Sequence, residues 1–387
     1  MGNKSKKFST KCVHEGEIKD TMYQGIVSPL FMSTTYPWFG GDDPEKKPYP
    51  RYFNTPNQEF LSKKIASLEN GEKALIFTSG MAAISTSIMA NVKTGDHIVV
   101  QNDIYGGTRN FVLTEFDKFG IEYSFTDGLD PSSFSDQIKD NTVGIYLETP
   151  SNPLLKIVDL KSVSSIAKDN GVWTMIDNTF SSPVNQNPID HGIDIVLHSA
   201  TKYLGGHSDI SAGAVISTES RIEQILNSAK NFGGNLSDYT VWLLERSIKT
   251  LHIRVKEQTN NAKTLAKMLD ENTNISKVYY PGLESHPSHE IAKSQMNDFG
   301  GMMSFDLNNN VDVYDFLKSL NLVKPGMSLA GVETTVNFPM KTSHGLMTQK
   351  ERDIQGIGDK LIRLSVGIES YEDIYEDLDQ AIKSSIK

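Results

Sequence analysis

The chain of 387 residues has a single cysteine, Cys12, which excludes a framework of intrachain disulfides. It has no apolar run close to the ~18 residues of a membrane-spanning helix, and residues 1–11 lack the apolar core of a signal peptide. Positive charge is not in excess either, because the formal net charge is −10 and is spread along the chain. These absences predict a protein of the reducing cytosol that binds neither membranes nor nucleic acid.

The composition, with 38% hydrophobic and 22% charged residues, is that of an ordinary soluble globular enzyme, and the length suffices for two domains. Residues 1–52 contain several prolines and few periodic apolar positions, so we expect an extended arm suited to contacts between subunits. Residues 53–249 are predicted to form a large domain, and residues 250–387 a smaller α+β domain.

Apolar strands alternate with helical stretches through most of the predicted large domain. The predicted strands are 74–77, 97–101, 143–147, 172–176, 193–197 and 212–217. This alternation predicts an α/β fold with a mostly parallel sheet flanked by helices, and with ligand groups at the carboxyl ends of the strands. Further on we expect a long helical region over 237–269, strands over 300–307 and 361–367, and an acidic amphipathic helix over 371–382.

The most informative segment is HSATKYLGGHSD (198–209), in which Lys202 closely follows an apolar run. Ser199 and Thr201 can hydrogen-bond a phosphate through their hydroxyls, and two glycines after the lysine allow a tight turn away from a flat cofactor. The segment therefore predicts a lysine that holds pyridoxal phosphate as a Schiff base. Taken alone, it is also compatible with a surface lysine in a polar loop.

The same cofactor makes three further demands on the chain. Its ring nitrogen needs a carboxylate, and Asp177 ends a predicted strand that precedes the lysine. Its phosphate needs backbone donors, which a strand–turn–helix through Ser79, Gly80 and Met81 supplies. Tyr105 follows another predicted strand and is placed to stack on the ring, a contact that contributes about 1 kcal/mol. The structural alternatives are a strand-end cap for the aspartate and a packing role for the tyrosine.

These residues occur within a longer series of motifs. In order they are YPRYFN (49–54), TSGMAAI (78–84), IYGGT (104–108), ETPSNP (148–153), DNTF (177–180), HSATKYLGGHSD (198–209), SLAGVET (328–334) and IRLSVGIE (362–369). The chain thereby resembles the trans-sulfuration enzymes, the Cys/Met metabolism family of pyridoxal-phosphate enzymes. The resemblance implies a fold-type I architecture, a small-molecule amino acid as substrate, and a homotetramer built as a dimer of dimers with shared active sites.

The resemblance also implies roles that the sequence alone does not indicate. Tyr49 and Arg51 match residues that reach the cofactor phosphate of the adjacent subunit. Arg363 matches the arginine that forks onto the substrate α-carboxylate, a bidentate geometry that lysine does not reproduce. Asn152 matches a residue beside the ring hydroxyl of the cofactor, and Ser328 matches one near the carboxylate site.

Several positions bear on the substrate rather than on the fold. Pro48 stands where some cystathionine γ-lyases have a glutamate, and an arginine often found after Gly-Gly-Thr-Asn occurs one place early, as Arg109 before Asn110. Both departures weaken the inference that the distal amino acid of cystathionine is gripped in the usual way. Gly107 replaces the usual cysteine of methionine γ-lyases, and Glu333 matches an acidic residue associated with γ-chemistry.

Together these features predict an enzyme that acts on sulfur amino acids by γ-elimination or γ-replacement, as a cystathionine γ-lyase or γ-synthase does. In this hypothesis Lys202 takes and shuttles the α-proton, and Tyr105 helps to activate the incoming amine. A cystathionine β-lyase or a methionine γ-lyase is the alternative. A pyridoxal-phosphate aminotransferase or aldolase, or a non-catalytic homologue, is more remote. No metal site is expected, because the His286–His289 spacing is interrupted by Pro287 and lacks a third ligand nearby.

Overall fold

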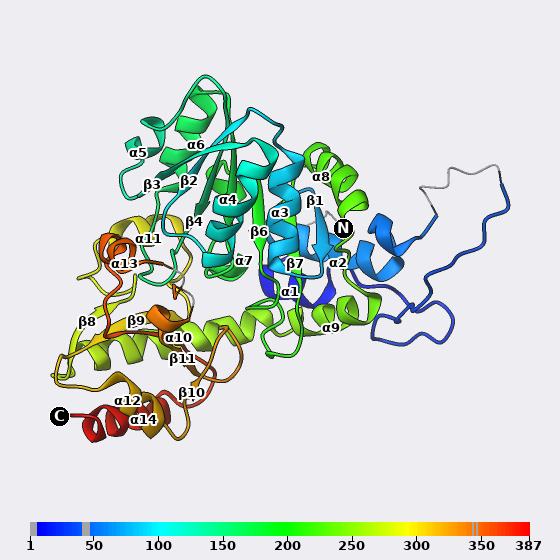
Figure 1. Cartoon of the computed structure of the whole chain (residues 1–387). Helices are drawn as coiled ribbons and strands as arrows, with labels where there is room; N and C mark the ends of the chain where they lie inside the picture. The colour runs from blue at the N-terminus through cyan, green and yellow to red at the C-terminus, as the bar shows by residue number, and fades with distance from the viewer. Residues whose placement is uncertain (1–5, 41–46, 343, 346) are drawn as a thin grey trace.

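The computed structural model describes residues 6–40, 47–342, 344–345 and 347–387, and it contains two sheets with separate cores (Figure 1). The larger sheet has seven strands in the order β1-β7-β6-β5-β4-β2-β3. These are β1 (Lys73–Phe77), β2 (His97–Gln101), β3 (Glu122–Thr126), β4 (Thr142–Glu148), β5 (Trp173–Asp177), β6 (Ile195–His198) and β7 (Gly213–Ser217). All run in one direction except β7, which pairs antiparallel with both β1 and β6.

Helices cover both faces of the larger sheet, which explains why most of its strands, the edge strand β3 excepted, are nearly continuous apolar runs (Figure 1). The helices of this part are α2 (Pro56–Leu68), α3 (Gly80–Ala90), α4 (Gly106–Phe119), α5 (Ser132–Ser135), α6 (Leu160–Asp169), α7 (Ser182–Asn185) and α8 (Glu219–Phe232). Short 3₁₀ turns are η2 (Pro50–Tyr52) and η3 (Pro188–His191). The predicted fold class, a mostly parallel sheet flanked by helices, is confirmed.

The predicted helical region 237–269 consists of two helices, α9 (Asp238–Ile248) and α10 (Leu251–Asp270). The buried side chain of Arg254 stabilises the break between them. Its Nη2 donates to the carbonyl of Ser247 at 3.0 Å, and its Nε donates to Thr250 Oγ1 at 3.2 Å. The Ser247 carbonyl, one of the last in α9, therefore finds a partner without the helix continuing. Helix α10 then leads from the larger sheet to the smaller one (Figure 1).

The smaller sheet has the order β10-β11-β12-β9-β8 and is antiparallel except for β10 with β11. Its strands are β8 (Ile275–Tyr279), β9 (Met302–Leu307), β10 (Lys324–Pro325), β11 (Thr335–Asn337) and β12 (Leu361–Ser365). The accompanying helices are α11 (His289–Gln295), α12 (Val313–Ser319), η4 (Pro339–Lys341), α13 (Gln349–Gln355) and α14 (Tyr371–Ser384). The strands and the terminal helix expected from sequence thus lie at β9, β12 and α14. Among the helices described, none is long and apolar enough to cross a membrane.

The N-terminal segment is partly anchored and partly exposed. Helix α1 (Phe8–His14) packs against the body, where Lys64 Nζ donates to the carbonyls of Cys12 at 3.0 Å and Val13 at 3.2 Å. The following stretch extends away from the body (Figure 1) and leaves large apolar side chains in solvent, with Ile26 96% and Phe39 94% exposed. A surface of this kind is typical of a contact with another chain.

Candidate active site

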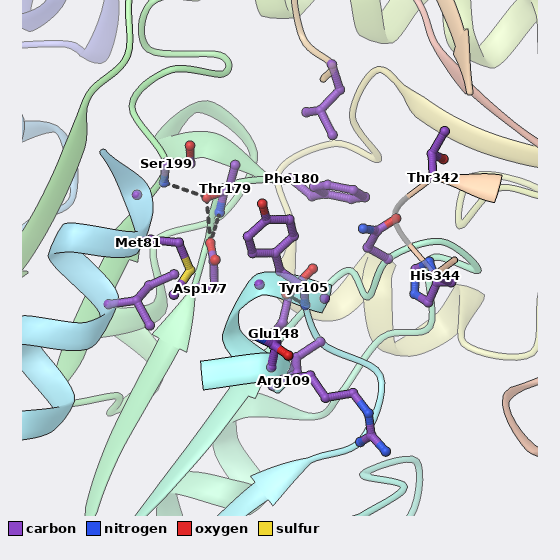
Figure 2. Close-up of a pocket in the computed structure, with 18 of the residues that line it drawn as sticks. Met81, Tyr105, Arg109, Glu148, Asp177, Thr179, Phe180, Ser199, Thr342 and His344 are labelled. Atoms are coloured by element: carbon purple, nitrogen blue, oxygen red, sulfur yellow. Dashed lines mark hydrogen bonds between the residues drawn. The ribbon is translucent and has the colours of Figure 1, made fainter. Parts of the chain in front are cut away.

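A cavity of about 620 Å³ lies where the carboxyl ends of the larger sheet's strands face the C-terminal part of the chain. Its lining includes the predicted site residues Ser79, Gly80, Met81, Tyr105, Asn152, Asp177, Ser199, Thr201, Lys202, Ser328 and Arg363. Figure 2 shows Met81, Tyr105, Asp177 and Ser199 side by side in this region. Residues from separate motifs are therefore brought to one place.

Lys202 lies in a tight turn directly after β6. Its N–H donates to the Ser199 carbonyl at 3.1 Å and its carbonyl accepts from Gly206 at 2.7 Å. Gly206 has a φ of +67°, and the Arg254 guanidinium fills the space where a side chain there would project. The Lys202 Nζ donates to Ser328 Oγ at 2.5 Å. Burial, and then the charge of Arg363, lower the pKa of Lys202 to about 8. The amine can thus exchange a proton near neutral pH.

Asp177 is the last residue of β5, and its buried carboxylate is held by Thr179. The backbone N–H and the hydroxyl of Thr179 both donate to Asp177 Oδ1, at 3.0 and 2.5 Å. Thr179 Oγ1 in turn accepts from the Ser199 N–H at 2.8 Å, so one hydroxyl joins the ends of β5 and β6 (Figure 2). Burial raises the pKa of Asp177, and the two Thr179 hydrogen bonds oppose that rise. A nearby cationic group would favour the ionised form.

The turn before α3 presents backbone donors to the cavity. Ser79 caps the helix by accepting from the Ala82 N–H at 3.0 Å, while the first N–H groups of a helix have no partner within it. A Cβ at Gly80 would lie 2.8 Å from the Ser199 Cβ, so a side chain does not fit there. Thr201 also lines this end, but its hydroxyl exchanges hydrogen bonds with the Ala212 backbone. The arrangement is suited to an anion such as a phosphate.

Tyr105 precedes α4, and its ring lies over Gly107, where a Cβ would come within 2.5 Å of the ring carbon Cε1. Its backbone N–H donates to Glu148 Oε2 at 2.6 Å. Burial and the neighbouring Asp177 raise the pKa of Glu148 well above its usual value. The sequence reasoning missed Glu148 as a site residue. It ends β4 within the ETPSNP motif, which is the same strand-end signal that identified Asp177.

Arg363, on β12, is buried and faces the lysine from the C-terminal part of the chain. Its Nη1 donates to Asn152 Oδ1 at 2.9 Å and its Nη2 to the Ser328 carbonyl at 3.1 Å. Its buried Nε has no hydrogen-bond partner within the described part of the chain. Burial lowers the pKa of Arg363 to about 10, which still leaves it cationic at neutral pH. A buried cation with an unused donor is a receptor for a carboxylate.

Three predicted residues do not line the cavity. Arg51 Nη1 donates to the carbonyl of Lys230 at 2.6 Å, and Tyr49 is 45% exposed next to it. Glu333 is exposed and also lies outside the cavity lining. Their predicted roles remain predictions, and the first two depend on a second subunit.

The donor set fits pyridoxal phosphate. The cavity combines an amine of lowered pKa, a buried carboxylate on a strand end, an exposed aromatic ring and a helix N-terminus with adjacent hydroxyls. No group of three or more His, Cys, Asp or Glu side chains in the described ranges could hold a metal ion. This fold and this site define a pyridoxal-phosphate-dependent enzyme of fold type I.

The chain belongs to the Cys/Met metabolism PLP-dependent enzyme family, whose sequence model matches residues 9–383. It is 41% identical over 377 residues to the cystathionine beta-lyase of Lactococcus lactis subsp. cremoris strain MG1363, covering 97% of this chain and 99% of the relative. It is 40% identical over 379 residues to the cystathionine gamma-lyase of Bacillus subtilis strain 168, covering 98% and 100%. The crystal structure of cystathionine gamma-lyase from Lactobacillus plantarum complexed with L-serine superimposes with a TM-score of 0.94 at 37% identity, covering 98% and 99%. The protein is therefore a trans-sulfuration enzyme.

Proposed function

We propose that the protein acts at Cγ of its amino-acid substrate, either by γ-elimination, which breaks the Cγ–S bond of a sulfur amino acid, or by γ-replacement, in which the sulfur of a thiol displaces the group bound to Cγ. The observation that carries the proposal is the pairing of Lys202 and Arg363 across one cavity. The amine of Lys202 has its pKa lowered to about 8, while Arg363 retains a buried donor for a carboxylate. A substrate held by its carboxylate at Arg363 would present its Cα to Lys202.

The residues that would hold the cofactor follow from the same cavity. Lys202 would hold it covalently, Asp177 would face its ring nitrogen, and Tyr105 would stack on its ring. Its phosphate would bind the N-terminus of α3 at Ser79, Gly80 and Met81, with Ser199, Thr201 and the neighbouring subunit's copies of Tyr49 and Arg51 adding donors. When bound, pyridoxal phosphate supplies an electron sink for negative charge at the substrate Cα.

Proton transfers are the part of the reaction that side chains of this chain perform. Lys202 Nζ, held by Ser328 Oγ at 2.5 Å, would accept the Cα proton. For γ-cleavage a second proton leaves Cβ, the Cγ–S bond breaks, and the leaving sulfur takes up a proton. For β-cleavage the Cβ–S bond breaks after the first transfer. Asn152 would orient Arg363 for the carboxylate through its 2.9 Å hydrogen bond, and Glu148 would fix Tyr105 through its backbone.

Product analysis tests this proposal. γ-Cleavage of L-cystathionine with water gives cysteine, 2-oxobutyrate and ammonia, and we expect 2-oxobutyrate as the main oxoacid. If cystathionine is not cleaved, the replacement reaction is tested with O-acetyl- or O-succinylhomoserine and cysteine. Pyruvate as the sole oxoacid would overturn γ-cleavage and establish β-cleavage, which yields homocysteine, pyruvate and ammonia. The 41% identity to a cystathionine beta-lyase supports this second candidate, as the 40% identity to a cystathionine gamma-lyase supports the first.

The turnover rate is expected to depend on pH through Lys202. A base must be unprotonated to accept a proton, and the pKa of Lys202 is lowered to about 8. Below that pH the amine is protonated, so kcat should fall about tenfold for each pH unit and should level off above it. Initial rates at saturating substrate across this range measure the profile. A kcat that stays constant well below pH 8 would contradict the role of Lys202 as the base.

We further propose a homotetramer whose active sites are shared between paired subunits. The exposed apolar arm, with Ile26 96% and Phe39 94% in solvent, supports burial against a second copy, and Arg51 lies outside the cavity of its own chain. Light scattering should give about four times the mass of one chain.

Complementation tests the shared site. Arg51→Ala and Lys202→Ala are each expected to be nearly inactive alone. When the two are co-expressed in equal amounts, random pairing makes half of the dimers mixed. Because each proposed site takes Lys202 from one subunit and Arg51 from the other, one of the two sites in a mixed dimer contains neither change. About a quarter of the wild-type activity should therefore return. No recovery, despite mixed dimers detected by two affinity tags, would contradict a shared site.

A further inference from the structure

A buried ion pair lies behind the strand ends of the larger sheet, on the face opposite the cavity. His198 is the last residue of β6, and its Nε2 lies 2.5 Å from Oε1 of Glu69, the C-cap residue of α2. A carboxylate only accepts, so Nε2 carries the proton of this contact. The two side chains are 2% and 0% exposed, and neither lines the cavity. Asp177 and Leu197 are register partners in β5 and β6, so His198 points to the opposite face from both.

Glu69 also holds the end of β5. Asn178, directly after Asp177, donates from Nδ2 to the same Oε1 at 2.8 Å, and Asn187 Nδ2 donates to Oε2 at 3.2 Å. A buried carboxylate is costly unless it is paired and hydrogen-bonded, and three side-chain donors meet these requirements here. One carboxylate therefore fixes the residue that follows Asp177 and the residue that precedes Ser199.

The end of β6 is joined to the Asp177 carboxylate by two short hydrogen bonds. The Ser199 N–H, next to His198, donates to Thr179 Oγ1 at 2.8 Å, and Thr179 Oγ1 donates to Asp177 Oδ1 at 2.5 Å (Figure 2). A shift of this strand end would move the hydroxyl that holds the carboxylate. The ion pair is thus coupled to the cavity although it does not line it.

His198 also acts on Asp177 through its charge. Burial raises the pKa of Asp177, whereas the hydrogen bonds from Thr179 and the positive charge of His198 lower it. The other titratable neighbours described for Asp177 are Tyr146 and Glu148 on β4, and burial together with Asp177 raises the pKa of each well above its usual value. Neither supplies positive charge. Among these described neighbours, His198 is therefore the one that favours an ionised Asp177.

We propose that Glu69 and His198 form a positioning pair for the carboxylate that faces the cofactor. Glu69 holds the His198 imidazole as a cation, and His198 keeps Asp177 ionised and in place for the protonated ring nitrogen of pyridoxal phosphate. The pair adds no net charge to the interior, because each member compensates the other. The inference rests on the proposed role of Asp177 and is independent of which substrate bond is cleaved.

Cofactor affinity tests the pair without any substrate. All variants carry Lys202→Ala, so that binding is reversible, and pyridoxal phosphate is titrated by absorbance at about pH 6 and about pH 8. An Asp177 with a higher pKa is less ionised at the lower pH and binds the protonated ring nitrogen less well there. In His198→Gln, which keeps a donor for Glu69 but removes the cation, the ratio of the Kd at the lower pH to the Kd at the higher pH should rise at least about fivefold. The titration of the cofactor itself is common to all variants and cancels in this comparison.

The Asp177→Asn background shows whether His198 acts through Asp177. There His198→Gln should change the Kd ratio by less than about twofold. An unchanged ratio in His198→Gln alone, or an equal rise in the Asp177→Asn background, would overturn the inference. If Asp177→Asn itself leaves the affinity unchanged, the proposed role of Asp177 fails, and the inference fails with it.

Two further variants separate charge from packing. Gln186 belongs to the same buried network without carrying charge, since its Nε2 donates to Asn178 Oδ1 at 3.0 Å. Gln186→Leu should lower Tm but leave the Kd ratio within about twofold of its original value. A rise equal to that of His198→Gln would assign the effect to packing and contradict the proposal.

Glu69→Gln provides a rescue of stability. In His198→Gln the buried Glu69 has lost its cation, so adding Glu69→Gln should raise Tm rather than lower it further. The double variant lacks the cation as well, so its Kd ratio should stay at least about threefold above the original, and it replaces His198→Gln in the comparison if that variant does not fold. A further fall in Tm on adding Glu69→Gln, or an original Kd ratio in the double variant, would show that the pair does not act through an ionised His198.

Discussion

Replacement of Lys202 by alanine is expected to lower kcat by at least about 10⁴-fold, because one side chain is proposed both to hold the cofactor and to carry the Cα proton. The geometry gives the reason for so large an effect. Nζ is 2.5 Å from Ser328 Oγ, and burial together with Arg363 brings its pKa to about 8. Any other amine that reached the cavity would not be held at the position of Lys202 Nζ. Initial rates of oxoacid release measure the loss.

Three controls make the Lys202 result specific. Lys202→Ala should still take up pyridoxal phosphate without a covalent bond, since Asp177 and the α3 N-terminus remain, and absorbance spectra of the dialysed protein test this. Methylamine should restore part of the proton transfer. Lys156, whose Nζ bonds Asp103 at 2.5 Å, provides a matched change, and Lys156→Ala should cost less than about tenfold. A loss below about 100-fold in Lys202→Ala would refute the assignment of the base.

The main features of the site were predictable because each depends on a local signal. Asp177 ends β5, Tyr105 follows β2 and Lys202 follows β6, and the carboxyl ends of parallel strands meet at one edge of a sheet. Local order along the chain therefore determines proximity in space. Glu148 carries the same signal at the end of β4. The cofactor makes no demand for a second carboxylate, so the sequence does not assign Glu148 a role, and only the structure shows its bond to the Tyr105 backbone.

The reversed direction of β7 also has a local cause. A parallel connection needs a crossover, usually a helix. The segment between β6 and β7 instead contains the Lys202 turn, and Thr201 pairs with Ala212 across it, N–H to carbonyl, at 3.1 Å. No helix crosses over there, so the chain returns antiparallel.

Other contacts join positions far apart in sequence and had no local signal. Arg363 and Asn152 are 211 residues apart, and Arg109 and Glu351 are 242 apart. The sequence does not determine which side chain of the C-terminal part will meet which strand end. The break between α9 and α10 also had no local signal in the sequence. Arg254, in α10, stabilises it by donating to the Ser247 carbonyl, and the same side chain donates to the Tyr203 carbonyl beside Lys202.

Replacement of Asp177 by asparagine is expected to lower kcat about 10³-fold while the protein stays folded. Asparagine keeps the acceptor that receives the two Thr179 hydrogen bonds but removes the negative charge. Without that charge the ring nitrogen of a bound cofactor loses the partner that stabilises its protonated form, so Cα–H cleavage slows. Exchange of the Cα proton with deuterated solvent, followed by NMR, measures this step directly. A loss confined to KM would contradict the proposed role.

A graded series separates charge from packing at this position. Thr179→Val removes one of the two hydrogen bonds to Asp177 Oδ1 and the acceptor for the Ser199 N–H, but leaves the carboxylate ionisable, so its loss should be about tenfold. Asp194→Asn changes a carboxylate at the opposite end of the same strands, where it accepts from Thr174 and Arg221, and it should leave kcat within about twofold. Because burial raises the pKa of Asp177 and Thr179 opposes that rise, Thr179→Val should also shift the loss of activity at low pH towards neutrality. If Thr179→Val equals Asp177→Asn in kcat, strand-end packing rather than the carboxylate charge controls the reaction, and the pyridine-nitrogen assignment fails.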